Sequence, residues 1–121
     1  MAAELGALDG STRMDCIAIK LDPGLLANPD ADMRYTLPSL LEERSGGVIE
    51  SDGYDYLDPS NIMVVFLKVS DLARATACIT DMIANVRVLE NDLRTAATVA
   101  VQRGEKFDVI YPADSQQEFI V

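Results

Sequence analysis

Apolar and polar side chains alternate along several stretches of the chain, as is typical of strands that bury one face. Residues 14–21, 95–102 and 107–111 show this period of two. Residues 62–69 are almost entirely apolar, which favours a strand covered on both faces. The pattern therefore predicts four strands spread over the whole chain.

A helical period appears in two places. Apolar side chains recur every three or four positions over residues 72–86, directly after a capping pair at Ser70-Asp71. A second helix is expected to begin near Pro38, because proline suits the first turn of a helix, and to end at Gly46-Gly47. Residues 25–37, before it, are ambiguous, with turn residues at Asn28-Pro29-Asp30 and with Leu25 and Leu26 expected to anchor a loop.

The stretch from Val48 to Leu57 contains Asp52-Gly53. Asp-Gly between alternating segments is a strong signal for a two-residue hairpin turn, so a hairpin is expected here. The alternative is one long strand with a bulge at Gly53.

This order of elements predicts an α+β fold with a mainly antiparallel sheet and two helices on one face. The ferredoxin-like βαββαβ plan, with hairpin additions, matches that order. Residues 1–13 are expected to be a disordered leader, residues 14–112 a single domain and residues 113–121 a tail.

The net negative charge of the chain disfavours some classes of binding partner. The 121 residues carry 20 acidic and 10 basic side chains, and the excess of acid is concentrated before residue 62. Direct contact with nucleic acid or an anionic membrane is disfavoured, because both need clustered Lys and Arg. No apolar run is long enough for a bilayer span, and the N-terminal stretch lacks the features of a secretory signal, so a cytoplasmic location is expected.

Residue types exclude much of the usual chemistry. The chain has no histidine, which removes the commonest general base and zinc ligand. Cys16 and Cys78 are the two cysteines, without a CxxC pattern, and are interpreted as reduced thiols. Asp52, Asp55 and Asp58 lack the order of a calcium loop and alternate faces on a strand. We therefore expect no catalytic residue, no metal and no cofactor, and predict that the chain is not an enzyme.

Acidic residues and tyrosines are interleaved in one window before the apolar run. Tyrosine is enriched at interfaces, and acidic neighbours would speed encounter with a basic protein. The predicted partner-binding residues are Glu50, Asp52, Tyr54, Asp55, Tyr56 and Asp58.

The face of the sheet away from the helices is a second candidate surface. It would carry small residues, namely Cys16, Ala18, Ala96, Thr98 and Ala100. Such a face suits a homodimer or a small ligand, so the alternative function is an oligomerising or ligand-binding regulatory domain.

The segments "LPSLLEERSGG" and "DGYDYL", followed by an apolar strand and an amphipathic helix, resemble small acidic bacterial proteins of the toxin-immunity type. The resemblance extends over about residues 14–112 and implies a single domain that neutralises a partner by binding it. It also implies Tyr54, Asp55 and Tyr56 as contacts.

Overall fold

The computed structural model describes residues 15–28, 31–57 and 62–112. The strands are β1 (Asp15–Leu21), β2 (Ile49–Leu57), β3 (Ile62–Val69), β4 (Arg87–Val88), β5 (Asn91–Asp92), β6 (Ala97–Arg103) and β7 (Lys106–Tyr111). The helices are α2 (Met33–Ser45) and α3 (Leu72–Asn85), and η1 (Pro23–Leu25) is a short 3-10 turn. The expected leader 1–13 and tail 113–121 lie outside the described residues.

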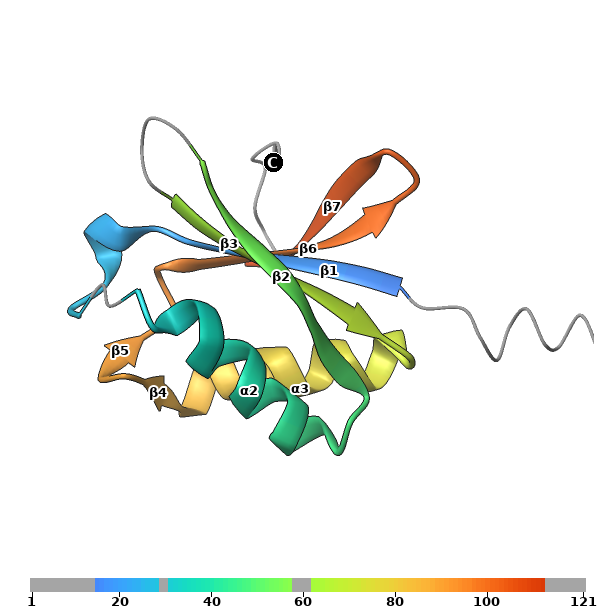
Figure 1. The fold of residues 1–121 in the computed structure, drawn as a ribbon, viewed down its shortest axis with the longest axis horizontal. Coiled ribbons are helices and arrows are strands. Elements are labelled where there is room, and N and C mark those ends of the chain that lie inside the picture. Colours follow the sequence, from blue (N-terminus) through green and yellow to red (C-terminus); the bar gives the residue numbers. More distant parts are fainter. Residues whose placement is uncertain (1–14, 29–30, 58–61, 113–121) are drawn as a thin grey trace, which may run out of the picture.

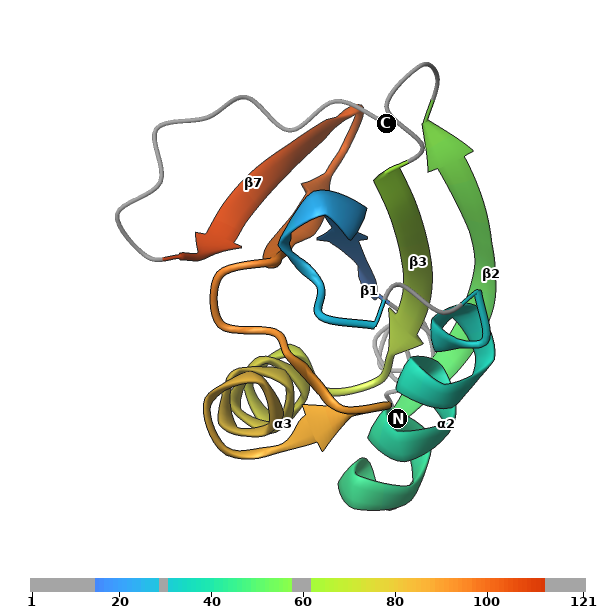
Figure 2. The ribbon, with the colours of Figure 1, turned by 90° about the vertical axis from the view of Figure 1, so that its left-hand side faces the viewer.

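Five strands form one sheet in the order β2-β3-β1-β6-β7, and every neighbouring pair is antiparallel. Both helices lie on the same face of this sheet (Figures 1 and 2). β4 and β5 form a small separate hairpin beside α3. The predicted α+β class, with two helices and an antiparallel sheet, is confirmed.

The hydrophobic core lies between the sheet and the helices. Alternate residues of β1, β3 and β6 point toward the helices, and α2 and α3 return apolar side chains at helical spacing. A fully buried Leu or Ile contributes about 1.5–3 kcal/mol by leaving water. The large side chains that are fully buried include Ile17, Ile19, Leu21, Met33, Leu37, Leu41, Leu67, Ile79 and Met82.

α3 forms where its pattern predicts it. The Asp71 side chain accepts a hydrogen bond from the backbone N–H of Arg74 at 3.1 Å, so it caps the first turn. The buried face carries Ala75, Ile79 and Met82, which repeat at three- and four-residue spacing.

The start of α2 was predicted wrongly, because the helix begins at Met33 and Pro38 lies inside it. Met33, Leu37 and Leu41 repeat every four residues and are fully buried. Their burial outweighs the one backbone hydrogen bond that proline removes. The helix ends as expected, at Gly46 in the left-handed conformation with φ 65°.

The predicted turn at Asp52-Gly53 is also wrong. β2 runs unbroken from Ile49 to Leu57 and pairs with β3 along both halves. The register shifts between Ser51 and Tyr54, and Gly53 has φ +97°, so the alternative of one strand with a bulge is confirmed. Pairing with the apolar strand β3 over the whole length outweighs the local preference of Asp-Gly.

The β4–β5 hairpin was not predicted. Its turn residues Leu89 and Glu90 have φ of 49° and 69°, a conformation that strains residues with a β-carbon. Asn91, which is fully buried, holds this end in place. Its side chain accepts from the backbone N–H of Asn28 at 2.6 Å and donates to the Asn28 carbonyl at 2.7 Å. We call this pair of hydrogen bonds the Asn91 clamp.

The other face of the sheet carries a smaller apolar cluster. Ala18, Val64 and Ala100 are fully buried there, with larger side chains packed against them. Cys16 and Thr98 lie on this open face as expected, because they share alternation with Ala18 and Ala100. Ala96 does not, since it precedes β6 and is buried in a turn. The side chains packed around the cluster are Leu57, Phe66, Phe107 and Val109.

Candidate functional site

Five of the six predicted partner-binding residues lie on β2, which forms one edge of the sheet (Figure 2). Residues Glu50 to Asp55 are all exposed, whereas Tyr56 is half-buried. Asp58 lies outside the described residues. The predicted window is therefore a strand edge open to a partner over most of its length.

Alternation along β2 divides the predicted residues between two sides of the sheet. Tyr54 pairs with Val65 and Tyr56 with Met63, both in the helix-side core, so the tyrosines face α2. Asp55 pairs with Val64 of the open-face cluster, so its side chain points to the opposite side. The sequence-based interpretation merged two surfaces that the strand separates.

Lys68 lies beside two of the acidic residues of β2, on the face of the sheet away from the helices. Glu50 is its cross-strand neighbour, and the Asp52 carboxylate lies 3.5 Å from its ammonium nitrogen. Both members of the Lys68–Asp52 pair are well exposed, so the pair contributes little to stability. Lys68 thus partly neutralises the negative charge of Glu50 and Asp52 on that face of the sheet.

The tyrosines of β2 meet Arg34 and Tyr35 of α2 in one group, here called the Arg–Tyr cluster (Arg34, Tyr35, Tyr54 and Tyr56). The Tyr54 ring lies edge-to-face with Tyr35 and with Tyr56, each at a centroid distance of 6.0 Å. The Arg34 guanidinium carbon lies 4.7 Å from the Tyr35 ring centre and 5.2 Å from that of Tyr54. Arg34 Nη1 also donates to the Tyr56 hydroxyl at 3.4 Å.

These contacts shift the electrostatics of the Arg–Tyr cluster. Hydrogen bonding with Tyr35, and then with Tyr56, raises the pKa of Arg34, so it stays charged. Hydrogen bonding with Arg34 lowers the pKa of Tyr35, whereas hydrogen bonding with Tyr35 raises the pKa of Tyr54. A cation over aromatic faces contributes about 0.5–1 kcal/mol at an exposed site. The cluster is therefore a preformed group of three tyrosine rings around one guanidinium.

Exposure singles out the Arg–Tyr cluster within the described part of the chain. Three large apolar side chains are exposed there, namely Tyr35 at 56%, Leu25 at 53% and Tyr54 at 42%. Two of these three touch each other in the cluster. Large apolar side chains that gather on a surface, with polar neighbours, are typical of interaction sites.

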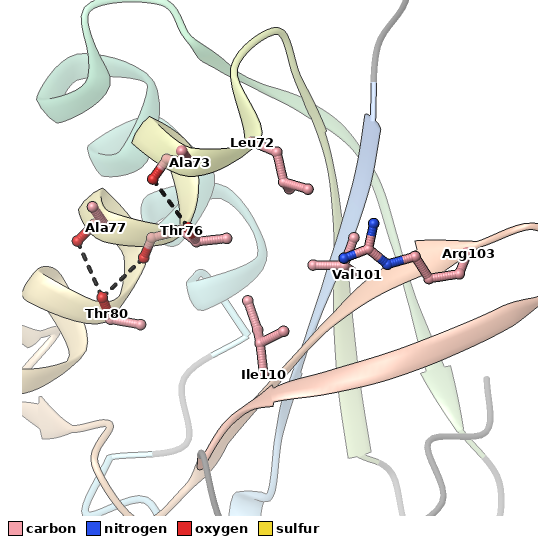
Figure 3. A pocket seen from close by; sticks show the side chains of 8 residues that line it. All are labelled: Leu72, Ala73, Thr76, Ala77, Thr80, Val101, Arg103 and Ile110. Carbon is pink, nitrogen blue, oxygen red and sulfur yellow. Dashed lines mark hydrogen bonds between the residues drawn. The ribbon is translucent and has the colours of Figure 1, made fainter.

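An open groove of about 660 Å³ lies between α3 and the β6–β7 hairpin (Figure 3). The Thr76 and Thr80 hydroxyls donate to backbone carbonyls of α3, so they are used within the helix. Among the described residues that line it, Arg103 is the one with a charge, and it pairs with Asp108 at 3.5 Å. The groove thus offers apolar contact without the several converging polar groups of a catalytic pocket.

We searched residues 15–28, 31–57 and 62–112 for side chains that could bind a metal ion or supply a reactive thiol. Within these ranges, no group of three or more His, Cys, Asp or Glu side chains is arranged to hold a metal ion. Cys16 and Cys78 are free thiols whose pKa values are raised mainly by burial, which is the opposite of activation. None of the helices described has the length and apolar composition to cross a membrane.

Sequence reasoning missed Arg34 and Tyr35, which supply half of the Arg–Tyr cluster. The missed signal is the four-residue repeat of Met33, Leu37 and Leu41, which extends the helix back to residue 33. Once that turn is helical, Arg34 and Tyr35 flank its buried face and come within reach of β2.

Comparisons with protein-family models, with curated proteins and with solved structures found no match for this chain.

Proposed function

We propose that the chain is a non-enzymatic protein-binding module, and that the Arg–Tyr cluster is the anchor of its interface. The observation that carries this proposal is the contact between the exposed Tyr35 and Tyr54, held around Arg34. Tyrosine and arginine are the residue types, with tryptophan, that dominate binding energy at protein interfaces. Rings that are already in contact lose little side-chain freedom when a partner arrives.

The acidic side of β2 complements this anchor. With a net charge of −10, the chain would attract a basic protein and speed its encounter, while the cluster would retain it. Glu50, Asp52, Tyr54, Asp55 and Tyr56 remain the proposed contacts, with Asp58 as the sequence-based addition. An immunity-type inhibitor that binds a basic partner in the cytoplasm fits these properties, and the free thiols suit a reducing compartment.

Affinity capture with the full chain, followed by identification and purification of the retained protein, tests the proposal. Tyr35→Ala/Tyr54→Ala is expected to weaken binding of that protein about 100-fold, because two interface tyrosines are lost. Glu50→Ala/Asp52→Ala/Asp55→Ala should mainly slow association and reduce its dependence on salt.

Leu25→Ala is the matched control, because it removes the third exposed large apolar side chain, which is not part of the cluster. It should bind like the wild type. Equal affinity of the Tyr35/Tyr54 variant and the Leu25 variant would reject the cluster as the anchor. A captured protein that is acidic would reject the steering argument.

A second candidate function is favoured by the apolar cluster on the open face. Side chains from all five strands meet there, from Leu57 on β2 to Val109 on β7. A homodimer, or a regulatory domain that holds a small ligand, would use this face. Sedimentation is expected to show a dimer that Thr98→Arg breaks; a monomer without thermal shifts from a metabolite panel would reject this candidate.

For the fold, we propose the ferredoxin-like plan with β7 as an added edge strand. Two features support it. The connection through α2 joins β1 and β2 across β3, and the connection through α3 leads from β3 to β6 across β1. In each connection, two strands joined through a helix are separated in the sheet by one other strand. Two interlocked split β-α-β units of this kind are typical of the ferredoxin-like plan.

A further inference from the structure

Side chains bind three backbone N–H groups of the edge strand β2. An edge strand presents unpaired N–H and C=O groups to which a second chain adds readily, unless something covers them. Along β2, three backbone N–H groups donate to side-chain oxygens rather than to a strand. They belong to Ile49, Ser51 and Tyr56.

Two of these oxygens come from α2, which runs along β2 (Figure 2). Ser45 Oγ accepts from Ile49 at 3.0 Å, and Glu42 Oε2 accepts from Ser51 at 2.9 Å. Glu42 and Ser45 are three residues apart, so both lie on the helix face turned toward the strand.

The third oxygen is on β2 itself. Asp55 Oδ1 accepts from the N–H of the next residue, Tyr56, at 2.8 Å. Between the capped groups lies the bulge at Asp52-Gly53, which interrupts the regular spacing that an added strand would need. The edge therefore carries two capped amides before the bulge and one after it.

We propose that β2 is closed to strand addition by Glu42, Ser45 and Asp55, so that a partner reaches this edge through side chains. Its contact would be the folded surface of another protein rather than an extended peptide. The statement about a partner rests on the proposed function, whereas the closure of the edge does not. With these amides capped, the chain exposes the Arg–Tyr cluster while β2 does not pair with β2 of a second copy of the chain.

The test needs no partner, so its failure is distinct from failure of the proposed function. Glu42→Ala/Asp55→Ala removes two caps and two charges from the full chain. The amides of Ser51 and Tyr56 are expected to exchange hydrogen about tenfold faster, as loss of one hydrogen bond implies. Sedimentation velocity should show association beyond the wild-type state that grows with concentration.

Two variants separate closure from charge and from folding. Glu43→Ala/Glu105→Ala removes the same charge, from a neighbour of Glu42 and from the β6–β7 turn, and should match the wild type in both measurements. Glu42→Gln/Asp55→Asn removes the charge but keeps an oxygen acceptor at each site, so exchange should stay slow and no added association should appear.

Two results would overturn the inference. Wild-type exchange at Ser51 and Tyr56 in the alanine variant would mean that the side chains do not guard these amides. Faster exchange without added association would mean that the guarded amides do not hold back strand addition.

Discussion

Side chains bind backbone groups in two regions of this molecule, and the two regions differ in burial. The Asn91 clamp joins a fully buried side chain to Asn28, whereas Glu42 and Asp55 reach the amides of β2 at an exposed edge. The bonds are of similar length, between 2.6 and 2.9 Å. Water replaces a lost bond at the edge but not a buried side chain's bonds, so the clamp stabilises the fold and the edge bonds control association.

The comparison is tested most strongly by breaking the clamp. Asn91→Ala is expected to lower the free energy of unfolding by about 2–3 kcal/mol, because the clamp, the side-chain bonds to the Leu89 carbonyl and the Met33 sulfur, and the packing of a buried side chain are lost. Urea denaturation measures this change. Asn85→Ala is the control, since Asn85 is exposed and bonds only within the last turn of α3, and it should cost less than about 0.5 kcal/mol. If Asn91→Ala and Asn85→Ala lowered the free energy of unfolding equally, burial would not explain the difference between the two regions.

Ser45→Ala tests the one edge bond that is buried. Ser45 is 8% exposed, and its loss leaves the buried N–H of Ile49 without the oxygen that accepts from it. The expected loss is about 1–2 kcal/mol in urea denaturation, between the clamp and the exposed edge. Ser39→Ala, on the exposed side of the same helix, should be neutral or slightly stabilising. A loss at Ser45 no larger than at Ser39 would contradict the ranking.

Glu90→Gly tests the turn that directly precedes Asn91. Glu90 is exposed and has φ 69°, so glycine removes strain without removing a buried contact. Stability is expected to rise by about 1 kcal/mol. Glu105→Gly makes the same change in the β6–β7 turn, where glycine has no such strain to relieve, and should be neutral or destabilising. A decrease in the melting temperature of the Glu90 variant would contradict the argument.

The smallest effect is expected at Asp92, which follows Asn91. Two contacts with Arg94, a side-chain pair and a backbone N–H, lower the pKa of Asp92 from 3.8 to about 2. Because the folded pKa is the lower one, the stabilisation is complete above pH 4 and is lost as pH falls through about 2. Carboxyl NMR titration should find this low pKa, and Arg94→Gln should return it toward 3.8. A normal pKa in the wild type would contradict the pairing.

The sequence predicted the elements whose pattern and packing agree. β3 is almost entirely apolar and α3 has both a cap and a clear periodicity, so local preference and burial give the same answer. The strands β1, β6 and β7 followed from alternation in the same way. The α+β class depends on these elements and was therefore predictable.

The missed features are places where packing overrode a local rule. Pro38 and Asp52-Gly53 are strong local signals, yet the core positions of α2 and the pairing of β2 with β3 outweigh them. The turn at Leu89-Glu90 carries no signal at all, because neither residue favours positive φ. The Arg–Tyr cluster was half-predicted for this reason: Tyr54 and Tyr56 were found, but Arg34 and Tyr35 depend on the misplaced helix start.

Pro38 also removes one backbone hydrogen bond from the middle of α2. It has no N–H to offer the carbonyl of Arg34, four residues earlier, so the first turn is joined to the rest of the helix by one backbone bond fewer. The later turns are fastened to β2 through Glu42 and Ser45. Force applied at Tyr35 would therefore flex the helix at its proline before it disturbed the fastened half. The two exposed rings of the Arg–Tyr cluster therefore differ in their support, because Tyr35 precedes the proline of α2 whereas Tyr54 lies on β2.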